Sequence, residues 1–435
     1  MNIIFISPIS WDNSGGAHRP VQLAREFARR GHTVTYLEIE TSRAPVPFSN
    51  PRVLNLRDLD WDELNLVRAW YGYDYAAPLT HPSSLFPLPS SGVVICSAPF
   101  RPALEYVAAF VEQGAAIVYD VLDDISEMRA LGVFCYDDLA ETYLAQNADL
   151  IVTLSPRLKE KFRAYPNVTL IRDGVDLAPF LDPQGSRRSL SQETPLGLKT
   201  GDLTLGFWGT MWDYNLDVPL LQMLTRARSQ WQWHFIGAYD LDPARPSIAN
   251  ALAAPNVHFH DSVPREMLAQ YAQSFDVCIL PVPVTPFNLA RDPLKVYEYL
   301  ACYKPVVATN LEQLADMPYV YLSCSAEEFL NNVERAAYTN IDHPLLDTYL
   351  NEQTWAKRAD QFLNAIESLP RQARTLPTPL RGAMPNAENE IDRWQAFAHH
   401  LERLAQAQQA HIADLENALR ESGLAQKLKR AARLK

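Results

Sequence analysis

The sequence is poor in cysteine. Its five cysteines are far apart in the chain: Cys96, Cys135, Cys278, Cys302 and Cys324. No two of them have the CxxC spacing of a zinc site, and their odd number does not suit a disulfide framework. This usage indicates a reducing compartment, and we expect the chain to be cytoplasmic.

Long apolar runs are also missing. The chain has no uninterrupted apolar stretch of about 18 residues, which a membrane-spanning helix requires. Its start, from Met1 to Ser7, lacks a basic segment and is too short for a signal peptide. The sequence therefore predicts a first β-strand there and no membrane span.

Basic residues are in deficit. Lys and Arg number 39 against 51 Asp and Glu, a formal net charge of −12. This balance argues against broad nucleic-acid binding, but a local basic pocket for a phosphorylated ligand remains compatible with it. With 47% hydrophobic residues the chain is globular, and its 435 residues favour two domains with an appendage.

Short apolar segments alternate with amphipathic ones, which predicts an α/β fold of parallel sheets covered by helices. We expect strands at 2–7, 33–39, 92–97, 115–120, 149–154, 167–171, 203–208, 232–237, 256–260, 275–280, 305–309 and 319–323. We expect helices at 20–30, 101–113, 137–147, 155–164, 215–230, 264–273, 293–302, 326–337 and 352–368. The predicted divisions are a first domain at 1–180, a linker at 181–201, a second domain at 202–345, a crossover helix region at 346–368, a linker at 369–386 and a helical tail at 387–435.

The loop after the first strand has no G-x-G-x-x-G, so the dinucleotide fingerprint is absent. Gly15 and Gly16 nevertheless allow a ligand to approach the backbone closely. Arg19, at the start of the next helix, is placed to meet an anion. A mobile loop is the alternative.

Three carboxylates follow the fourth predicted strand: Asp120, Asp123 and Asp124. Mutual repulsion at the end of a buried strand raises a carboxylate pKa and suits it to accept a proton. Asp123 or Asp124 is therefore the candidate base, with a solvent-facing helix-capping turn as the alternative. No second acidic cluster supports a metal site.

The most informative segment runs from Arg291 to Thr309. Asp292 suits an N-cap and Pro293 the first helical position. Lys295 and Glu298 would then share one helix face near its start. A helix start with a lysine suits a phosphate, and a carboxylate one turn later can accept hydrogen bonds from ribose hydroxyls. A surface ion pair is the alternative.

The tail at 387–435 shows a weak heptad pattern and ends in a basic segment from Lys427 to Lys435. The heptads predict self-association or docking of a partner. The basic end is a solvated tail, an assembly contact or a peripheral contact with an anionic membrane.

Together, several motifs over residues 1–368 resemble the GT-B glycosyltransferases, especially the family 4-like group of bacterial surface polysaccharide synthesis. The matching stretches are Gly15-Gly16 with Arg19, Gly31-His-Thr-Val-Thr35, Asp173-Gly-Val-Asp176, Asn256-Val-His-Phe-His-Asp-Ser-Val-Pro264 and Pro293-Leu-Lys-Val-Tyr-Glu-Tyr-Leu-Ala301.

The resemblance implies two Rossmann-like domains facing across a cleft, the second binding a nucleotide diphosphate-sugar and the first a glycan or lipid-linked acceptor. Glu298 would bind the ribose and Lys295 the diphosphate, with Asp261 and Val263 near the nucleobase. The remaining expected contacts are Gly16, Gly209, Thr210 and Arg291 for the donor, and Gly15, His18, Arg19 and Asp120 for the acceptor.

The chain departs from the family pattern at two places. Ala290 stands where the family often has Glu, and no Arg and Lys follow Gly209. Arg291 and Lys295 would then supply the positive charge without a metal. Asp123 falls at or beside the family's histidine position, which favours an inverting displacement. Two alternatives stay open: a sugar-nucleotide epimerase of the same architecture, and a non-catalytic scaffold subunit.

Overall fold

The computed structural model describes residues 1–9, 11, 18–41, 52–55, 64–71, 92–99, 101–131, 138–180, 195–196, 202–212, 214–240 and 247–377. Gly15, Gly16 and the tail at 387–435 lie outside these residues. Within them, none of the helices combines the length and the apolar character that crossing a membrane demands.

The described chain forms two compact units. Unit 1 contains Met1–Gly174, Ala290–Asp292 and the described residues from Thr354 onward. Unit 2 contains Val175–Leu289 and Pro293–Gln353. The chain therefore returns to unit 1 for three residues, directly before the segment that carries Lys295 and Glu298.

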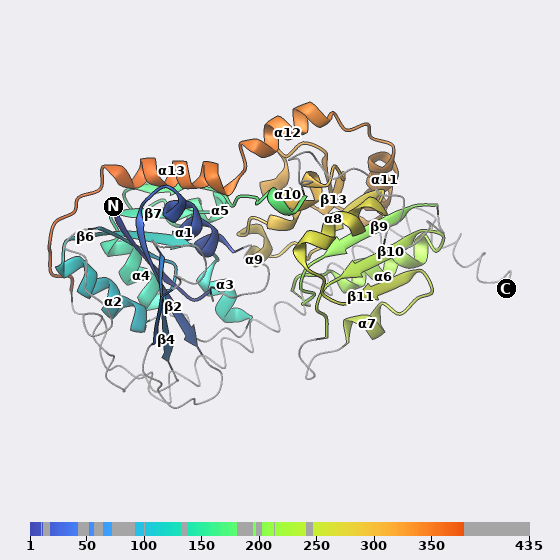
Figure 1. Ribbon diagram of the computed structural model, residues 1–435. Helices are drawn as coiled ribbons and strands as arrows, with labels where there is room; N and C mark the ends of the chain where they lie inside the picture. Colours follow the sequence, from blue (N-terminus) through green and yellow to red (C-terminus); the bar gives the residue numbers. More distant parts are fainter. Residues whose placement is uncertain are drawn as a thin grey trace, which may run out of the picture. The chain divides into compact units, whose positions relative to one another are not determined.

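Unit 1 is built on an eight-stranded sheet of order β3-β4-β2-β1-β5-β6-β7-β8 (Figure 1). All neighbours are parallel except β3, which runs antiparallel to β4. The strands are β1 (Asn2–Ser7), β2 (Thr33–Thr41), β3 (Arg52–Asn55), β4 (Leu64–Tyr71), β5 (Gly92–Cys96), β6 (Ala115–Val121), β7 (Leu150–Thr153) and β8 (Val168–Leu170). Every residue of β5 and β6 is buried, as expected for central parallel strands covered on both faces.

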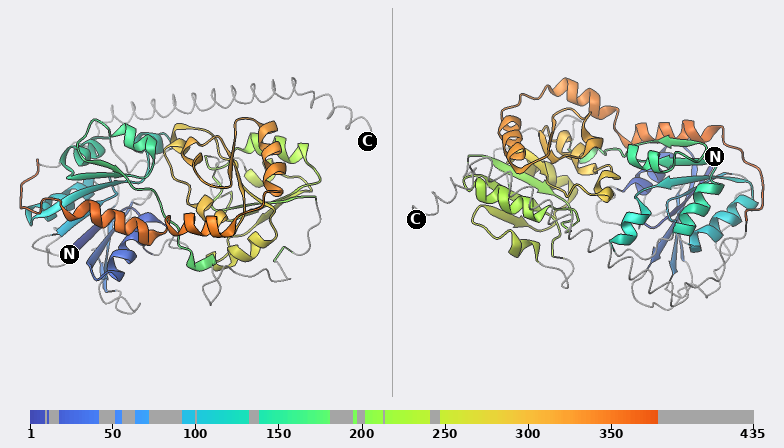
Figure 2. Two further views of the ribbon diagram at one scale, coloured as in Figure 1. Left: turned by 90° about the horizontal axis from the view of Figure 1, so that it is seen from above. Right: turned by 180° about the vertical axis from the view of Figure 1, so that it is seen from behind.

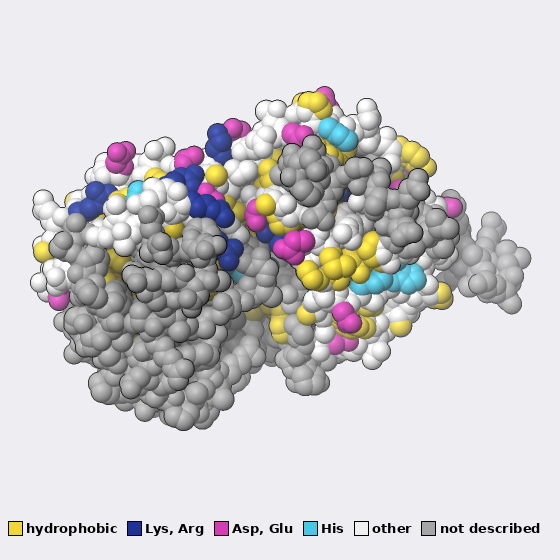
Figure 3. All heavy atoms as spheres, viewed as in Figure 1, with side chains coloured by type: hydrophobic (Ala, Val, Ile, Leu, Met, Phe, Trp, Pro, Cys, Tyr) yellow, Lys and Arg dark blue, Asp and Glu magenta, His cyan; other side chains and the backbone are white. Residues whose placement is uncertain are grey.

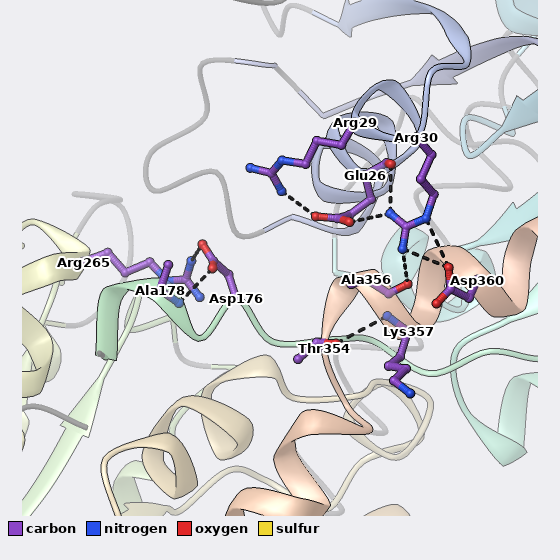
Figure 4. A network of polar contacts seen from close by, with 10 residues as sticks. All are labelled: Glu26, Arg29, Arg30, Asp176, Ala178, Arg265, Thr354, Ala356, Lys357 and Asp360. Carbon is purple, nitrogen blue, oxygen red and sulfur yellow. Dashed lines mark hydrogen bonds and ion pairs between the residues drawn. The ribbon is translucent and has the colours of Figure 1, made fainter. Parts of the chain in front are cut away.

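Helices cover both faces of this sheet. They are α1 (Arg19–Arg29), α2 (Arg101–Glu112), α3 (Ile125–Ala130), α4 (Asp138–Asn147), α5 (Pro156–Lys161) and α13 (Trp355–Glu367). Figure 1 shows α1 and α13 on one side and α2 and α4 on the other. Arg30 Nη1 lies 2.6 Å from Glu26 Oε2 of α1, and Arg30 Nη2 lies 2.9 Å from Asp360 Oδ1 of α13, so these two helices are tied together (Figure 4).

Unit 2 is built on a six-stranded parallel sheet of order β11-β10-β9-β12-β13-β14 (Figure 2). Its strands are β9 (Thr204–Trp208), β10 (Gln232–Ile236), β11 (Val257–His260), β12 (Val277–Leu280), β13 (Val306–Thr309) and β14 (Val320–Ser323). The strand order reverses between β9 and β12. Ligands bind outside the carboxyl ends of the strands at such a reversal.

The helices of unit 2 are α6 (Val218–Ala227), α7 (Ile248–Ala251), α8 (Arg265–Gln273), α9 (Pro286–Leu289), α10 (Leu294–Ala301), α11 (Ala326–Ala337) and α12 (His343–Asn351). Side chains cap several of their N-termini: Asp217 accepts from Leu220 N, Ser325 from Glu328 N and Asp342 from Leu345 N. These caps satisfy backbone N–H groups that have no partner inside the helix.

The predicted fold class is confirmed: both units are α/β with parallel, Rossmann-like sheets. Each predicted strand has its counterpart. Two strands, β3 and β4, were not foreseen in the irregular region 41–91. The predicted N-cap role of Asp292 is wrong. Pro293 occupies the cap position of α10 without a side-chain cap, because the Asp292 carboxylate binds Arg172 instead.

Candidate functional site

The floor of the candidate site in unit 2 is made by two glycines at the carboxyl ends of β9 and β10. Gly209 has φ +125° and Gly237 has φ +137°, which side-chain-bearing residues rarely adopt. A Cβ on Gly237 would lie 2.3 Å from the Gly209 carbonyl oxygen. Gly209 N donates to Ile236 O at 2.9 Å. Gly237 is thus packed against Gly209, and Gly209, at the end of β9 beside the strand-order reversal, is partly exposed backbone without a side chain.

Lys295 lies directly over this floor. Its Nζ is 4.5 Å from the centre of the Phe207 ring, and a Cβ on Gly209 would come within 2.7 Å of the same Nζ. The ammonium group is therefore held beside bare backbone at the start of α10. A cation so placed can neutralise a phosphate.

Glu298, one turn along α10, is buried and engaged on both oxygens. Trp208 Nε1 donates to Oε2 at 2.8 Å, and Arg265 Nη2 lies 2.8 Å from Oε1. The prediction that Lys295 and Glu298 act from one helix did not include these partners. The sequence did contain a signal that could have pointed to Arg265: it is the first residue of the helix that follows the expected nucleobase loop.

Three further predicted donor contacts of unit 2 follow its strands. Thr210 follows Gly209 and is exposed, as is Asp261, the first residue after β11. Val263 is half-buried and packs against the core of unit 2. Both segments follow carboxyl ends of strands. Gly209 and Thr210 lie beside the strand-order reversal at the end of β9, whereas Asp261 and Val263 follow the outer strand β11.

In unit 1, Arg19 is the centre of a buried charge cluster. Its Nε lies 3.0 Å from Asp120 Oδ1 and its Nη1 3.2 Å from Asp173 Oδ1. Arg19 and Asp120 are 3% and 0% exposed, so the pair is shielded from solvent. Burial raises the pKa of the Asp120 carboxyl, against the opposing attraction of Arg19. These two predicted acceptor contacts are therefore partners of each other.

The three residues that return to unit 1 are fixed there by specific bonds. Ser155 Oγ donates to Ala290 O at 2.6 Å. Arg172 Nη2 lies 2.7 Å from Asp292 Oδ1, and Asp173 N donates to Asp292 Oδ2 at 2.9 Å. Because the Asp292 side chain is fully buried, this pair anchors the segment firmly.

Arg291, between them, lies in unit 1 and not with Lys295. Its Nε is 3.7 Å from Asp123 Oδ1. His18, the residue before α1, has a lowered pKa because it is buried and because Arg291 is nearby. The structure therefore brings Arg291, expected at the donor, together with the candidate base and with a predicted acceptor contact.

The two candidate bases have different surroundings. Burial raises the pKa of Asp123 to about 6, opposed by Arg291 and assisted by the charge of Asp124. Asp124 instead accepts from Lys161 Nζ at 2.9 Å and from Ser126 Oγ at 2.6 Å. Its pKa is lowered, because those bonds outweigh its partial burial. Asp123 is thus the carboxylate suited to take up a proton near neutral pH.

Histidines gather on β10 and β11 of unit 2. His234 Nδ1 lies 3.0 Å from His260 Nε2, and the His234 ring stacks on that of His258 at 4.7 Å. Figure 3 shows histidine side chains grouped beside hydrophobic ones on the face of the molecule that it presents. Across the described ranges, no group of three or more His, Cys, Asp or Glu residues is arranged to hold a metal ion.

Comparison with known proteins shows what the chain is similar to. Residues 202–336, which include Gly209, Arg265, Lys295 and Glu298, match the family model described as Glycosyl transferases group 1. The fold is that of the GT-B glycosyltransferases. The motif resemblance noted in the sequence is confirmed by this match and by the solved structures described next.

Three solved structures share the fold of this chain. The E. coli protein structure described as "Trehalose-6-phosphate from E. coli bound with UDP-2-fluoro glucose" has a TM-score of 0.62 at 10% identity. The match covers 85% of this chain and 100% of that one. Alr3699/HepE of Anabaena, in complex with UDP and glucose, has a TM-score of 0.56 at 14% identity, with 85% and 99% covered. Sucrose-phosphate synthase of Thermosynechococcus elongatus has a TM-score of 0.54 at 17% identity, with 94% and 99% covered.

A curated relative is closer in sequence. The protein named "Putative teichuronic acid biosynthesis glycosyltransferase TuaH", of Bacillus subtilis (strain 168), is 30% identical over 190 residues. The match covers 42% of this chain and 46% of TuaH, so the chain spans less than half the length of this relative.

Proposed function

We propose that this protein is a glycosyltransferase that moves a sugar from a nucleotide diphosphate-sugar to a glycan or lipid-linked acceptor in bacterial surface polysaccharide synthesis. The observation that carries the proposal is the placement of Lys295 beside the backbone of Gly209 at the strand-order reversal, with Glu298 one turn further along α10. The family match over 202–336 and the name of TuaH support it.

In this proposal unit 2 binds the donor. Lys295 neutralises the diphosphate, assisted by the N-terminal N–H groups of α10. Glu298 accepts hydrogen bonds from the ribose hydroxyls, while Asp261 and Val263 flank the nucleobase. Because Lys295 supplies positive charge where the leaving diphosphate develops negative charge, the reaction proceeds without a metal ion.

Unit 1 supplies the base and the acceptor contacts. Asp123, with a pKa of about 6, takes the proton of the acceptor hydroxyl. The hydroxyl oxygen forms a bond to the anomeric carbon as the bond from that carbon to the diphosphate breaks, so the configuration is inverted. His18, the residue directly before α1 in the same unit, contacts the acceptor. Arg19 is buried in its pairs with Asp120 and Asp173, so the expected direct contacts of Arg19 and Asp120 with the acceptor are not part of this proposal.

A calorimetric and thermal-shift screen tests the donor site. UDP, GDP, CDP, ADP and dTDP are added with and without Mg²⁺, because a ligand that binds only the folded state raises its stability. We expect one diphosphate to bind selectively without Mg²⁺. Glu298→Ala and Lys295→Ala should each abolish that binding, while Glu327→Ala, on the first turn of α11, should leave it unchanged.

Absence of binding by every diphosphate at millimolar concentration would overturn the transferase proposal and favour a scaffold role. A diphosphate-sugar that is converted without any acceptor would favour an epimerase instead. Stereochemistry is read from the anomeric configuration of the product, and a retained configuration would contradict the role given to Asp123.

For the tail at 387–435 we propose self-association or contact with the inner, cytoplasmic face of a membrane through its basic end. The support is its heptad pattern and the cluster of Lys and Arg from 427 to 435. Deleting the tail and measuring both mass in solution and binding to anionic vesicles tests the two roles. A truncated variant that keeps the wild-type number of subunits and the wild-type vesicle binding would contradict both.

A further inference from the structure

The Glu298 carboxylate is held from two sides by side chains that no motif predicted. Arg265 approaches Oε1 with Nε at 3.0 Å and Nη2 at 2.8 Å. Trp208 Nε1 donates to Oε2 at 2.8 Å. A carboxylate offers about four lone-pair sites, so these bonds leave acceptor capacity chiefly on Oε2 and fix its direction.

Arg265 is itself immobilised. Its Nη1 lies 3.4 Å from Asp176 Oδ2, and its guanidinium stacks 5.7 Å from the centre of the Phe180 ring. Figure 4 shows Arg265 and Asp176 pointing toward each other. Only 10% of the Arg265 side chain is exposed, so the guanidinium has little freedom to leave Glu298.

Trp208 is fixed in the same way. Its ring meets that of Tyr299 edge-on at 4.3 Å, and Trp208 N donates to Tyr299 Oη at 3.2 Å. Tyr299 lies next to Glu298 on α10, so the indole is located by the same helix whose carboxylate it binds. Both partners of Glu298 thus hold one orientation before any ligand arrives.

We propose that Trp208 and Arg265 are positioning residues that aim Oε2 of Glu298 at a ribose hydroxyl. They thereby make the site selective for ribonucleoside diphosphates over nucleoside diphosphates that lack that hydroxyl. The inference rests on the proposed function, since it assigns the chemistry of the same donor site. A preorganised acceptor strengthens a hydrogen bond because no reorientation is needed when the ligand binds.

The test compares dissociation constants for UDP, GDP, CDP and ADP with those of their 2′,3′-dideoxy counterparts. For the nucleotide that binds, the wild-type protein should prefer the ribose form by about 10-fold or more, the scale of a hydrogen bond to a charged group. Trp208→Phe keeps the ring packing but removes the N–H. Arg265→Lys keeps the charge but removes the fork. Each should reduce the preference to about 3-fold or less.

Matched controls separate this role from general stability. Trp233→Phe makes the same change at a fully buried tryptophan in β10, whose Nε1 has no hydrogen-bond partner among the described residues. Arg228→Lys alters an arginine of unit 2 that pairs with Glu334 at 3.0 Å. Both controls should keep the wild-type ribose preference. Should Arg265→Lys fail to fold, Arg265→Gln and Trp208→Phe carry the test.

The outcomes are distinct. If no diphosphate binds the wild-type protein, the proposed function itself fails. If a diphosphate binds and Trp208→Phe and Arg265→Lys keep the full ribose preference, only the positioning role is overturned. If both variants lose the ribose preference and both controls keep it, the positioning role holds, and the single 2′-deoxy and 3′-deoxy forms show which hydroxyl donates to Oε2.

Discussion

Nη2 of Arg172 lies 2.7 Å from Oδ1 of Asp292, and Asp292 is the last residue of unit 1 before the chain enters unit 2. Two residues later α10 begins, with Lys295 and Glu298 in its first turns. The pair therefore anchors the last residue of the three-residue segment that precedes α10 in the sequence. A buried pair of this kind costs more to break than a surface pair, because the remaining charge is left without a partner.

Asp292→Ala should lower the free energy of unfolding by about 3–5 kcal/mol, since Arg172 and the Asp173 N–H both lose their acceptor. Urea unfolding measures this loss. The control is Asp360→Ala, which removes a carboxylate that is 54% exposed from its pair with Arg30 and should cost less than about 1 kcal/mol. Equal losses in the two variants would contradict the anchoring role of Asp292.

Asp123→Asn should lower kcat by about 100-fold or more, the usual contribution of a general base. The same change should stabilise the protein at pH 7 by about 1–3 kcal/mol, because burial disfavours the charged carboxylate. Its folded-state pKa of about 6 exceeds its ordinary value of 3.8, so wild-type stability falls as pH rises between those values and stays lower above them.

Asp124→Asn provides the control for Asp123. The pKa of Asp124 is lowered by Lys161 and Ser126, so its charged form stabilises the fold and its loss should destabilise at pH 7. Thermal melting and initial rates of both variants give the comparison. A larger loss of kcat in Asp124→Asn than in Asp123→Asn would reverse the assignment of the base.

The pH dependence of transfer should follow Asp123. We expect kcat/KM to fall on the acid side with an apparent pKa near 6, because the carboxylate must be ionised to accept a proton. Rates measured between pH 4.5 and pH 8 test this. A profile that is flat down to pH 4.5, where an ordinary carboxylate is still ionised, would rule out a base of this pKa.

Gly209→Ala should weaken diphosphate binding by about 10-fold or more, because the new Cβ would lie 2.7 Å from Lys295 Nζ and displace the ammonium group. Gly31→Ala is its control. Gly31 also has a positive φ, +77°, but a Cβ there would meet nothing within 4 Å. The Gly31→Ala variant should lose about 1 kcal/mol of stability through backbone strain and bind the diphosphate as the wild-type protein does. Calorimetry with the diphosphate that binds the wild-type protein distinguishes the two.

The sequence was informative wherever the signal was local. Lys295 and Glu298 could be placed on one helix face from spacing alone, and the central strands from their apolar runs. The strands β3 and β4 were missed because they lie in a region rich in proline and aromatic residues without clear periodicity. The N-cap of α10 was misassigned because a tertiary contact with Arg172 captured the Asp292 carboxylate that suited the cap by local rules.

By itself, the sequence determined two parallel α/β units and a helix in the second unit that carries a lysine and a glutamate on one face. Periodicity and short-range geometry suffice for both. Only the tertiary structure decided that Arg291 lies beside Asp123, that Lys161 holds Asp124 and that Arg265 and Trp208 hold Glu298. Those choices depend on charges and hydrogen-bond partners far apart in the chain, whose pairing is fixed when burial removes competing water.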